Sequence, residues 1–248
     1  GAWAALCAVG GMECVAAGRG GGACDHRRGW GGAGRQGAAD AGGRLTLLDT
    51  GDLAGGVSST GHGPLDATQQ SFSDGDADRW AGRLAGLTES AGMRVGVGIH
   101  SVRAVPRSQI GVVAAAAKGR PLHVHLSEQP AENEACQALY GMPPTALLEV
   151  EGALGPLTTG VHATHLTDRD IATLGATHTT VCLCPTTERD LADGIGPSRR
   201  LSDAGSLLSL GSDQHAVVDL FEEARALEMH ERLDSLQRGW FRPDELLS

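Results

Sequence analysis

Four short stretches of the chain carry side chains that bind metal ions or move protons. In chain order they contain His100, then His125 with Glu128, then His162, and finally Asp213. Neutral imidazole and carboxylate are ligands that Zn²⁺ takes in catalytic sites, and bound Zn²⁺ lowers the pKa of water to about 7. A lone histidine is usually an ordinary core or surface residue, and a carboxylate after a strand often caps the next helix. Four such stretches together favour metal-assisted hydrolysis.

Each of these stretches ends a run that is typical of a buried β-strand. After about residue 43, six such runs alternate with helical segments, at 44–49, 94–100, 122–128, 159–164, 180–185 and 207–213. Strands that alternate with helices indicate a parallel sheet, and a single α/β barrel suits a chain of 248 residues. The C-terminal ends of barrel strands meet at one mouth, so we expect the polar residues to gather there.

The segments between the strands carry helix signals. We expect five helices. The first is capped by Ser73 and Asp74 and runs to about Ala91, the second starts at Pro106, and the third covers 129–139. The fourth is capped by Thr167 with Asp168, and the fifth places Leu220, Ala224 and Leu227 on a single face. The Gly- and Ser-rich stretch over 50–72 is long for a connection in a compact domain, and loops of this length often bind ligands.

The first 42 residues lack the regular alternation of strand and helix patterns that follows them. Residues 18–37 are rich in Gly and Arg and offer almost nothing for a core, so we expect this run to be disordered or irregular. The run over 12–17, "MECVAA", is a seventh strand candidate, and "WAALCAV" over 3–9 reads as the end of a helix. We therefore divide the chain into a degenerate N-terminal segment, 1–42, and a barrel domain, 43–248.

Composition limits the partners. A formal net charge of −10 repels nucleic acid and anionic membrane surfaces. The sequence shows neither a run of about 18 apolar residues nor the order of a signal peptide, so we expect a cytoplasmic protein. The six cysteines are expected to be reduced. Cys182 and Cys184 resemble half of a metal site, but no second pair completes it, and we expect both thiols simply to pack.

Several motifs are similar to those of a known family. The runs "HLSE", "GVHATHL" and "LGSDQH" resemble the motifs on strands five, six and eight of the amidohydrolase superfamily. The longer runs "HSVRAVP", "HVHLSEQPAENEAC" and "CPTTERDLADGI" resemble those of the formimidoylglutamate deiminases of histidine degradation. The resemblance extends from about Ala38 to the C-terminus. It implies a (β/α)8 TIM barrel.

The resemblance also implies a role for each polar residue. It makes His125 and Asp213 zinc ligands, Glu128, His162 and Asp213 catalytic, and His100 and Arg103 contacts to the substrate. The implied reaction is the metal-dependent hydrolysis of N-formimino-L-glutamate, a small amino-acid derivative, to N-formyl-L-glutamate and ammonia.

The chain departs from the family in one important motif. The family holds its metal partly by a strand-one H-x-H pair, and no H-x-H occurs before residue 100, where His26 and His62 stand alone. With two expected ligands missing, zinc binding should be weak, unless another histidine such as His162 or His123 substitutes. We interpret the chain as a fragment with strands two to eight of the barrel and without the terminal β-domain. Its open edge strand would favour a homo-oligomer.

Two other readings remain open. An amidohydrolase acting on a ring amine would share the motifs, but it needs aromatic or apolar walls around the base. One Tyr, three Phe and four Trp argue mildly against it. The second alternative is a non-catalytic remnant that holds no metal, which the missing H-x-H supports.

Overall fold

The framework of the protein is one curved, eight-stranded sheet. The computed structural model describes residues 5–8, 13–16, 44–50, 53, 65, 70, 73–90, 93–214 and 217–246. The strands lie side by side in chain order: β1 (Ala5–Ala8), β2 (Glu13–Ala16), β3 (Arg44–Asp49), β4 (Met93–Ser101), β5 (Leu122–Leu126), β6 (Thr158–His162), β7 (Thr180–Leu183) and β8 (Leu208–Leu210). The pairs β1–β2 and β2–β3 are antiparallel, and all pairs from β3 to β8 are parallel.

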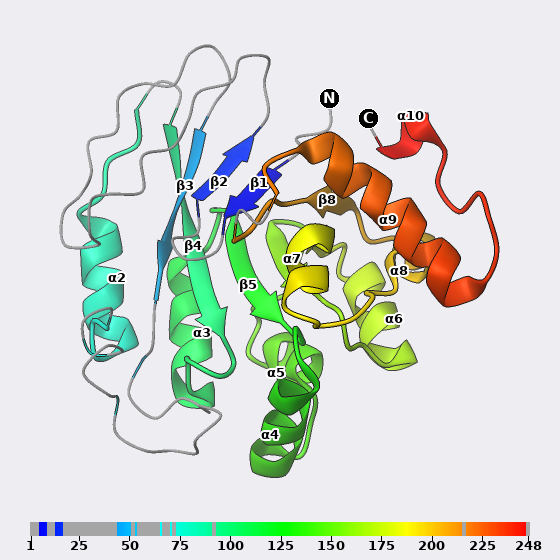
Figure 1. The fold of residues 1–248 in the computed structure, drawn as a ribbon. Coiled ribbons are helices and arrows are strands. Elements are labelled where there is room, and N and C mark those ends of the chain that lie inside the picture. Colours follow the sequence, from blue (N-terminus) through cyan, green and yellow to red (C-terminus); the bar gives the residue numbers. More distant parts are fainter. Residues whose placement is uncertain are drawn as a thin grey trace.

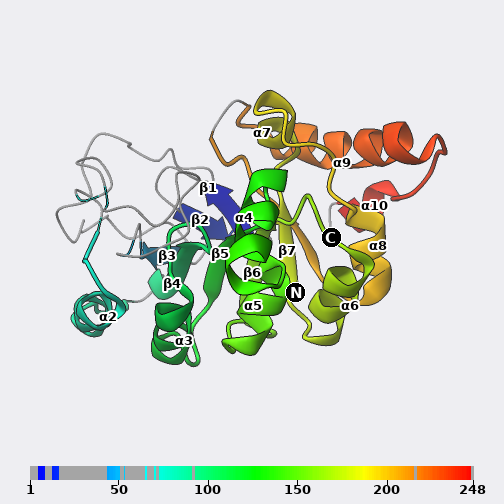
Figure 2. The same ribbon diagram turned by 90° about the horizontal axis from the view of Figure 1, so that it is seen from below.

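Helices follow the parallel strands. They are α2 (Ala77–Ala85), α3 (Arg107–Ala116), α4 (Pro130–Tyr140), α5 (Pro144–Val150), α6 (Asp168–Ala176), α7 (Pro185–Asp190), α8 (Ser198–Ala204), α9 (Leu220–Ser235) and α10 (Pro243–Leu246). Figures 1 and 2 show α3, α5 and α6 along the outer side of the curved sheet. The alternation of parallel strands and helices confirms the predicted α/β barrel class, here as a partial barrel with six parallel strands.

All seven predicted strands form, but the prediction of a helix in "WAALCAV" is wrong. Ala5–Ala8 is strand β1, which pairs with β2 so that Ala5 faces Ala16. Pairing with a neighbouring strand satisfies the backbone and outweighs the helix propensity of alanine and leucine. β1 also approaches β8 from the far edge of the sheet. The Gly/Arg run over 18–37 and most of 50–72 lie outside the described residues.

Helices α3, α4 and α6 begin where the sequence places them, whereas α2 is shorter than predicted. The side chain of Asp76, not of Ser73 or Asp74, accepts a hydrogen bond from the Arg79 N–H at 2.9 Å and starts the helix. Gly86 ends it by donating its N–H to carbonyls of the last turn. Asp74 instead forms an ion pair with Arg83. The short helices α5, α7, α8 and α10 were not predicted, since each spans too few residues to show a periodic pattern.

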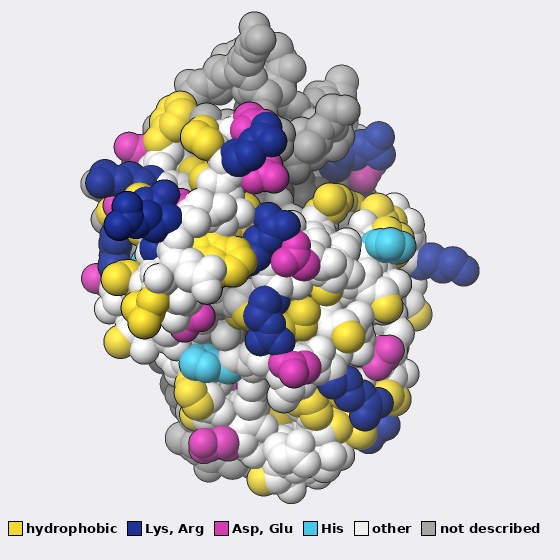
Figure 3. Space-filling view, turned by 90° about the vertical axis from the view of Figure 1, so that its right-hand side faces the viewer, with side chains coloured by type: hydrophobic (Ala, Val, Ile, Leu, Met, Phe, Trp, Pro, Cys, Tyr) yellow, Lys and Arg dark blue, Asp and Glu magenta, His cyan; other side chains and the backbone are white. Residues whose placement is uncertain are grey.

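The core lies between the sheet and its covering helices. Val95, Val97 and Ile99 of β4 are buried together with the intervening Gly96 and Gly98, so both faces of this strand are covered. Gly175 allows α6 and α8 to pack closely, because an added Cβ would lie 2.1 Å from the carbonyl oxygen of Ala204. On the face shown in Figure 3, basic and acidic side chains are interspersed rather than segregated. None of the described helices has the length and apolar character needed to cross a membrane.

Candidate metal and catalytic site

The register of the parallel strands brings the predicted residues to one end of the sheet. Leu126 at the end of β5 pairs with His162 at the end of β6, and His125 pairs with Ser101 of β4. The register shifts between Ile99 and Ser101, which leaves His100 as the extra residue of a bulge. Bulges near strand ends redirect a side chain and are common beside active sites.

His125 is held as a neutral imidazole. Its Nδ1 lies 2.5 Å from the carbonyl oxygen of His100, so Nδ1 carries the proton and donates it. Its Nε2 is buried and has no hydrogen-bond partner. Burial, with the nearby rings of His100 and His162, holds the pKa of His125 well below its usual value. A neutral ring with a free Nε2 is the form of histidine that binds a metal ion.

His162 lies beside His125 but in an acidic environment. The two rings are stacked with their centroids 5.7 Å apart. Nδ1 of His162 lies 3.3 Å from Glu188 Oε1, while Nε2 lies 3.6 Å from Glu128 Oε1 and 3.8 Å from Asp213 Oδ2. Burial alone would lower the pKa of His162, but the hydrogen bond to Glu188 and the charges of Glu128 and Asp213 outweigh it and raise the pKa to about 9.

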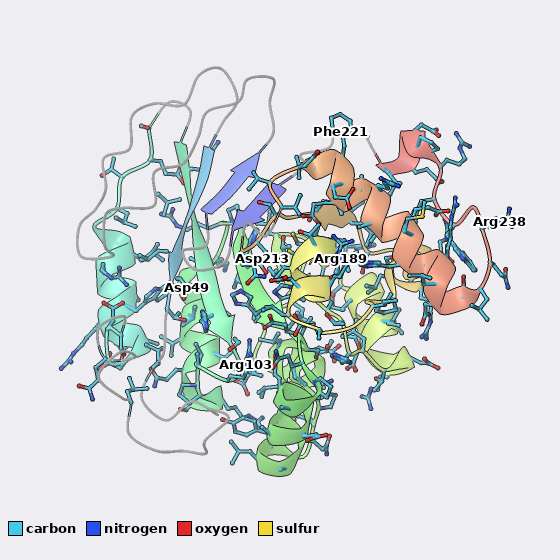
Figure 4. The ribbon with its side chains drawn as sticks, viewed as in Figure 1. Asp49, Arg103, Arg189, Asp213, Phe221 and Arg238 are labelled. Atoms are coloured by element: carbon cyan, nitrogen blue, oxygen red, sulfur yellow. The ribbon has the colours of Figure 1, made fainter. Side chains whose placement is uncertain are left out.

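Asp213 follows β8 and faces the same interior. Figure 4 shows it near the centre of the molecule, beside α7. Its side chain is buried, and Oδ1 has no hydrogen-bond partner. Burial raises the pKa of this carboxyl to about 6, even though His162 opposes the shift. Asp213 has φ 41°, and His162 has φ 69°. Non-glycine residues in this region of backbone space are uncommon and cluster at functional sites.

Glu128 connects Arg103 with His162. Its Oε2 accepts a hydrogen bond from Arg103 Nη2 at 2.8 Å, and its Oε1 faces His162 Nε2. Glu132, in the first turn of α4, is buried and accepts hydrogen bonds from the backbone N–H groups of Ser127 and Glu128. Its Oε2 also lies 3.6 Å from Arg103 Nε. The guanidinium predicted to hold a substrate carboxylate therefore already pairs with two carboxylates of the protein.

His100 occupies the rim of this site. Its side chain is 41% exposed, and its Nδ1 lies 3.5 Å from Asp49 Oδ1 at the end of β3. The rings of His100 and His125 meet edge-on with centroids 5.0 Å apart. An exposed imidazole next to a buried one is suited to contact a molecule that enters from outside, and the substrate contact of His100 stays a prediction.

The donor atoms fit a bound metal ion. Three buried atoms, His125 Nε2, His162 Nε2 and Asp213 Oδ1, have no hydrogen-bond partner, and buried polar atoms are rarely left in this state. Among the described residues, the group whose donor atoms all approach within 4.8 Å of one another consists of His162, Cys184 and Asp213. His125 lies outside this group, so the His125–Asp213 pair stays a prediction.

Sequence reasoning missed three contributors. Glu188 lies in the run "CPTTERDLADGI" and Glu132 in the predicted helix over 129–139, but the sequence predicted no role in the site for either residue. Cys184 was expected to pack, and it is indeed fully buried. A hydrogen bond with Cys182 and burial raise the pKa of its thiol well above the usual value. A carboxylate one helical turn after a strand-end residue, as in Cys184 and Glu188, is the signal that could have identified this pair.

One surface hollow, of about 510 Å³, lies away from the strand ends. Its lining residues are Pro106, Arg107, Ser108, Tyr140 and Glu151. Arg107 donates to Glu151 at 2.8 Å within it, so its charged groups are already paired. The unsatisfied donors and acceptors at the strand ends make that region the better candidate site.

Comparison with curated proteins gives several deaminases and deiminases. The chain is 37% identical over 158 residues to formimidoylglutamate deiminase of Pseudomonas aeruginosa, which covers 63% of this chain and 35% of that protein. It is 30% identical over 130 residues to the 5-methylthioadenosine/S-adenosylhomocysteine deaminase of Pyrococcus furiosus, covering 51% of this chain and 31% of that enzyme. The chain thus spans about a third of the length of these relatives.

Solved structures agree on the fold. An amidohydrolase from Brucella melitensis superposes with a TM-score of 0.73 at 26% identity, over 83% of this chain and 47% of that one. An adenosine deaminase from Xanthomonas campestris with bound zinc gives a TM-score of 0.62 at 21% identity, over 78% of this chain and 43% of that one, and shows the shared fold alone. The profile of the amidohydrolase family matches residues 61–248. The chain belongs to the amidohydrolase family.

Proposed function

We propose that this site hydrolyses the formimino group of N-formimino-L-glutamate, releasing ammonia and leaving N-formyl-L-glutamate. The observation that carries the proposal is the series of ionic contacts from Arg103 through Glu128 to His162 and on to Asp213, in which Arg103 donates a hydrogen bond to Glu128. It links a cation at the rim to groups that carry protons in the interior. The similarity to formimidoylglutamate deiminase, a hydrolase acting on carbon–nitrogen bonds, supports the choice of substrate.

The residues divide the work as follows. A divalent cation such as Zn²⁺, held by His125 and Asp213, would supply hydroxide near neutral pH. Asp213 takes a proton from the attacking water, and Glu128 passes it to the imino nitrogen. The second proton of that water reaches the same nitrogen through the same two carboxylates as the carbonyl forms, the carbon–nitrogen bond breaks and ammonia leaves. His162, kept protonated by its acidic neighbours, stabilises negative charge that develops on the attacking oxygen.

Arg103 and His100, at the rim of the site, would bind the substrate. Arg103 is the cation nearest to Glu128, and a substrate carboxylate would compete with Glu128 for its Nη2. Such an exchange would release Glu128 to move its proton when substrate is bound. His100 would contact the same small amino-acid-derived molecule. The proposal places the reaction in histidine degradation in the cytoplasm.

A second candidate is a deaminase of adenosine derivatives. The similarity to 5-methylthioadenosine/S-adenosylhomocysteine deaminases favours it. Arg103 at the rim is a cation that can bind a carboxylate, which favours a small acidic substrate.

The test is a substrate panel on the purified chain supplied with zinc. We expect ammonia from N-formimino-L-glutamate and none from 5-methylthioadenosine. The opposite pattern would replace our proposal by the second candidate. Ammonia from neither substrate, in a folded chain with zinc bound, would favour the non-catalytic reading.

A further inference from the structure

Three chemically different metal donors lie at the ends of three neighbouring strands. His162 ends β6, Cys184 follows β7 and Asp213 follows β8. One donor atom from each, a ring nitrogen, a thiol sulfur and a carboxylate oxygen, lies within 4.8 Å of the other two. All three residues are buried. An ion between them would be shielded from solvent and would touch nitrogen, sulfur and oxygen.

Two of the three donors have an orphaned atom in this space. His162 Nε2 and Asp213 Oδ1 are buried without a hydrogen-bond partner, although the residues that carry them are at most 2% exposed. A buried polar atom without a partner is destabilising, so two of them in one place call for a compensating contact. A bound cation provides that contact to both.

One buried carboxylate, that of Glu188, contacts both His162 and Cys184. Glu188 Oε1 accepts the backbone N–H of Cys184 at 2.7 Å and lies 3.3 Å from His162 Nδ1. Its contact with Nδ1 leaves Nε2 as the ring atom that faces Asp213. Metal-binding histidines commonly use their second nitrogen in this way, since a carboxylate behind the ring fixes its orientation.

The charges around the cluster favour a cation. Glu128, Glu188 and Asp213 all lie within 4 Å of the His162 ring. Arg103 contacts Glu128 at the rim, but no Lys or Arg among the described residues forms an ion pair with Glu188 or Asp213. Several carboxylates in a buried space stabilise a divalent ion strongly.

We propose that His162, Cys184 and Asp213 bind a thiophilic divalent cation of the Zn²⁺ or Co²⁺ type, with Cys184 as a thiolate ligand. The thiol loses its proton to solvent as the sulfur–metal bond forms. Cys184 thereby supplies the third protein ligand that a zinc site needs in a chain that shows no H-x-H pair before residue 100. The inference rests on the proposed metal-dependent function, because Asp213 serves both, and it makes His162 a ligand rather than a group that stabilises the attacking oxygen.

The test is a titration of the metal-free chain with Co²⁺ followed by absorption spectroscopy. Sulfur bound to Co²⁺ produces a thiolate-to-cobalt charge-transfer band in the near ultraviolet, which nitrogen and oxygen ligands do not produce. We expect this band to rise to saturation at one Co²⁺ per chain, and excess Zn²⁺ to remove it. Cobalt binding without the band, or no cobalt binding, would overturn the proposal.

Cysteine variants assign the band to a residue. Cys184→Ser should abolish it and weaken Co²⁺ binding by at least the ~10–100-fold that loss of an outer-shell partner costs. Cys182→Ser is the matched control, since Cys182 is equally buried on β7, two residues before Cys184, but is not one of the three donors. A chain with serine at Cys7, Cys14 and Cys24 should also keep the band. A band that survives Cys184→Ser, or disappears in either control while circular dichroism is unchanged, would refute the assignment.

The outcome is separable from that of the proposed reaction. A saturable band without ammonia release from N-formimino-L-glutamate would support the thiolate site and defeat the proposed substrate. Ammonia release from a cobalt-loaded chain that lacks the band would do the reverse.

Discussion

Two groups of buried acidic residues in this protein differ in how completely their hydrogen bonds are satisfied. On α9, Glu228 accepts the N–H groups of Gly239 and Phe241 and an ion pair from Arg232, at 2.6–3.1 Å. At the strand ends, Asp213 is equally buried and keeps an oxygen without a partner. The carboxylate that joins α9 to the segment after it receives hydrogen bonds from the protein, whereas Asp213 keeps an oxygen free for the ligand that we propose.

The pKa values of the two carboxyls reflect this difference. Burial by itself raises the pKa of both. At Glu228 the hydrogen bonds from Phe241, Arg232 and Gly239 outweigh burial and lower the pKa below its usual value. At Asp213 burial prevails and raises the pKa to about 6. Glu223 and Glu231 of α9 resemble Glu228 in hydrogen bonding, since they accept hydrogen bonds from Thr186 and from Ser198 with Arg199. At Glu223, however, burial outweighs these bonds and raises the pKa.

The largest expected effect is on catalysis and comes from Glu128→Gln. Glutamine keeps the size and part of the hydrogen bonding but cannot carry the proton, so turnover of N-formimino-L-glutamate should fall by about 10² to 10⁴. Zinc content should stay unchanged, and circular dichroism should show a folded chain. Near-normal turnover would remove the proton-carrying role, and a loss of zinc would make Glu128 a ligand.

Glu228→Ala should cause the largest loss of stability. Removing this carboxylate leaves two backbone N–H groups and Arg232 without their acceptor, at a cost of about 3 kcal/mol in the free energy of unfolding. Urea denaturation measures it. Asp234→Ala, an exposed change on the same helix, is the control and should cost less than about 0.5 kcal/mol. Equal effects of the two variants would contradict a supporting role for the α9 carboxylates.

The stability of the metal-free chain should fall as the pH rises above about 6.5. The folded chain holds the His162 proton up to a pKa of about 9, and the unfolded chain releases it near 6.5. The contribution is therefore complete below pH 6.5 and is lost as the pH passes 9, at a cost on the order of 3 kcal/mol. Denaturation in chelator from pH 6 to 9.5 measures this, and His162→Gln should flatten the curve. A flat wild-type curve would refute the charged state of His162.

The smallest effect, and the one that separates the two groups most clearly, comes from Asp213→Asn. At pH 8 without metal, this change removes a buried charge with an unpartnered oxygen, so the chain should gain about 1 to 2 kcal/mol in stability. It should also lose its metal. The corresponding Glu228→Gln should lower stability instead. A clear loss of stability in Asp213→Asn would place Asp213 with the supporting carboxylates.

Much of this architecture follows from the sequence alone. The β-rich runs and the helices between them are local patterns, and seven of the eight strands can be located from them. Parallel order then places the residues that follow each strand at one mouth, which is why His125, His162 and Asp213 could be grouped in advance. Segment 3–9 could not be assigned, because its composition suits a helix and only pairing with β2 makes it a strand.

The details of the site were decided by the tertiary structure. Arg103 meets Glu128 across 25 residues, and Glu188 meets His162 across 26, so neither contact leaves a periodic signal. The bulge at His100 and the positive φ of His162 and Asp213 depend on how neighbouring strands align, and they set where each side chain points. The sequence determined which residues reach the mouth of the barrel. Only the packing of β6, β7 and β8 brought the sulfur of Cys184 next to an imidazole and a carboxylate, because distances between strand ends depend on register and twist.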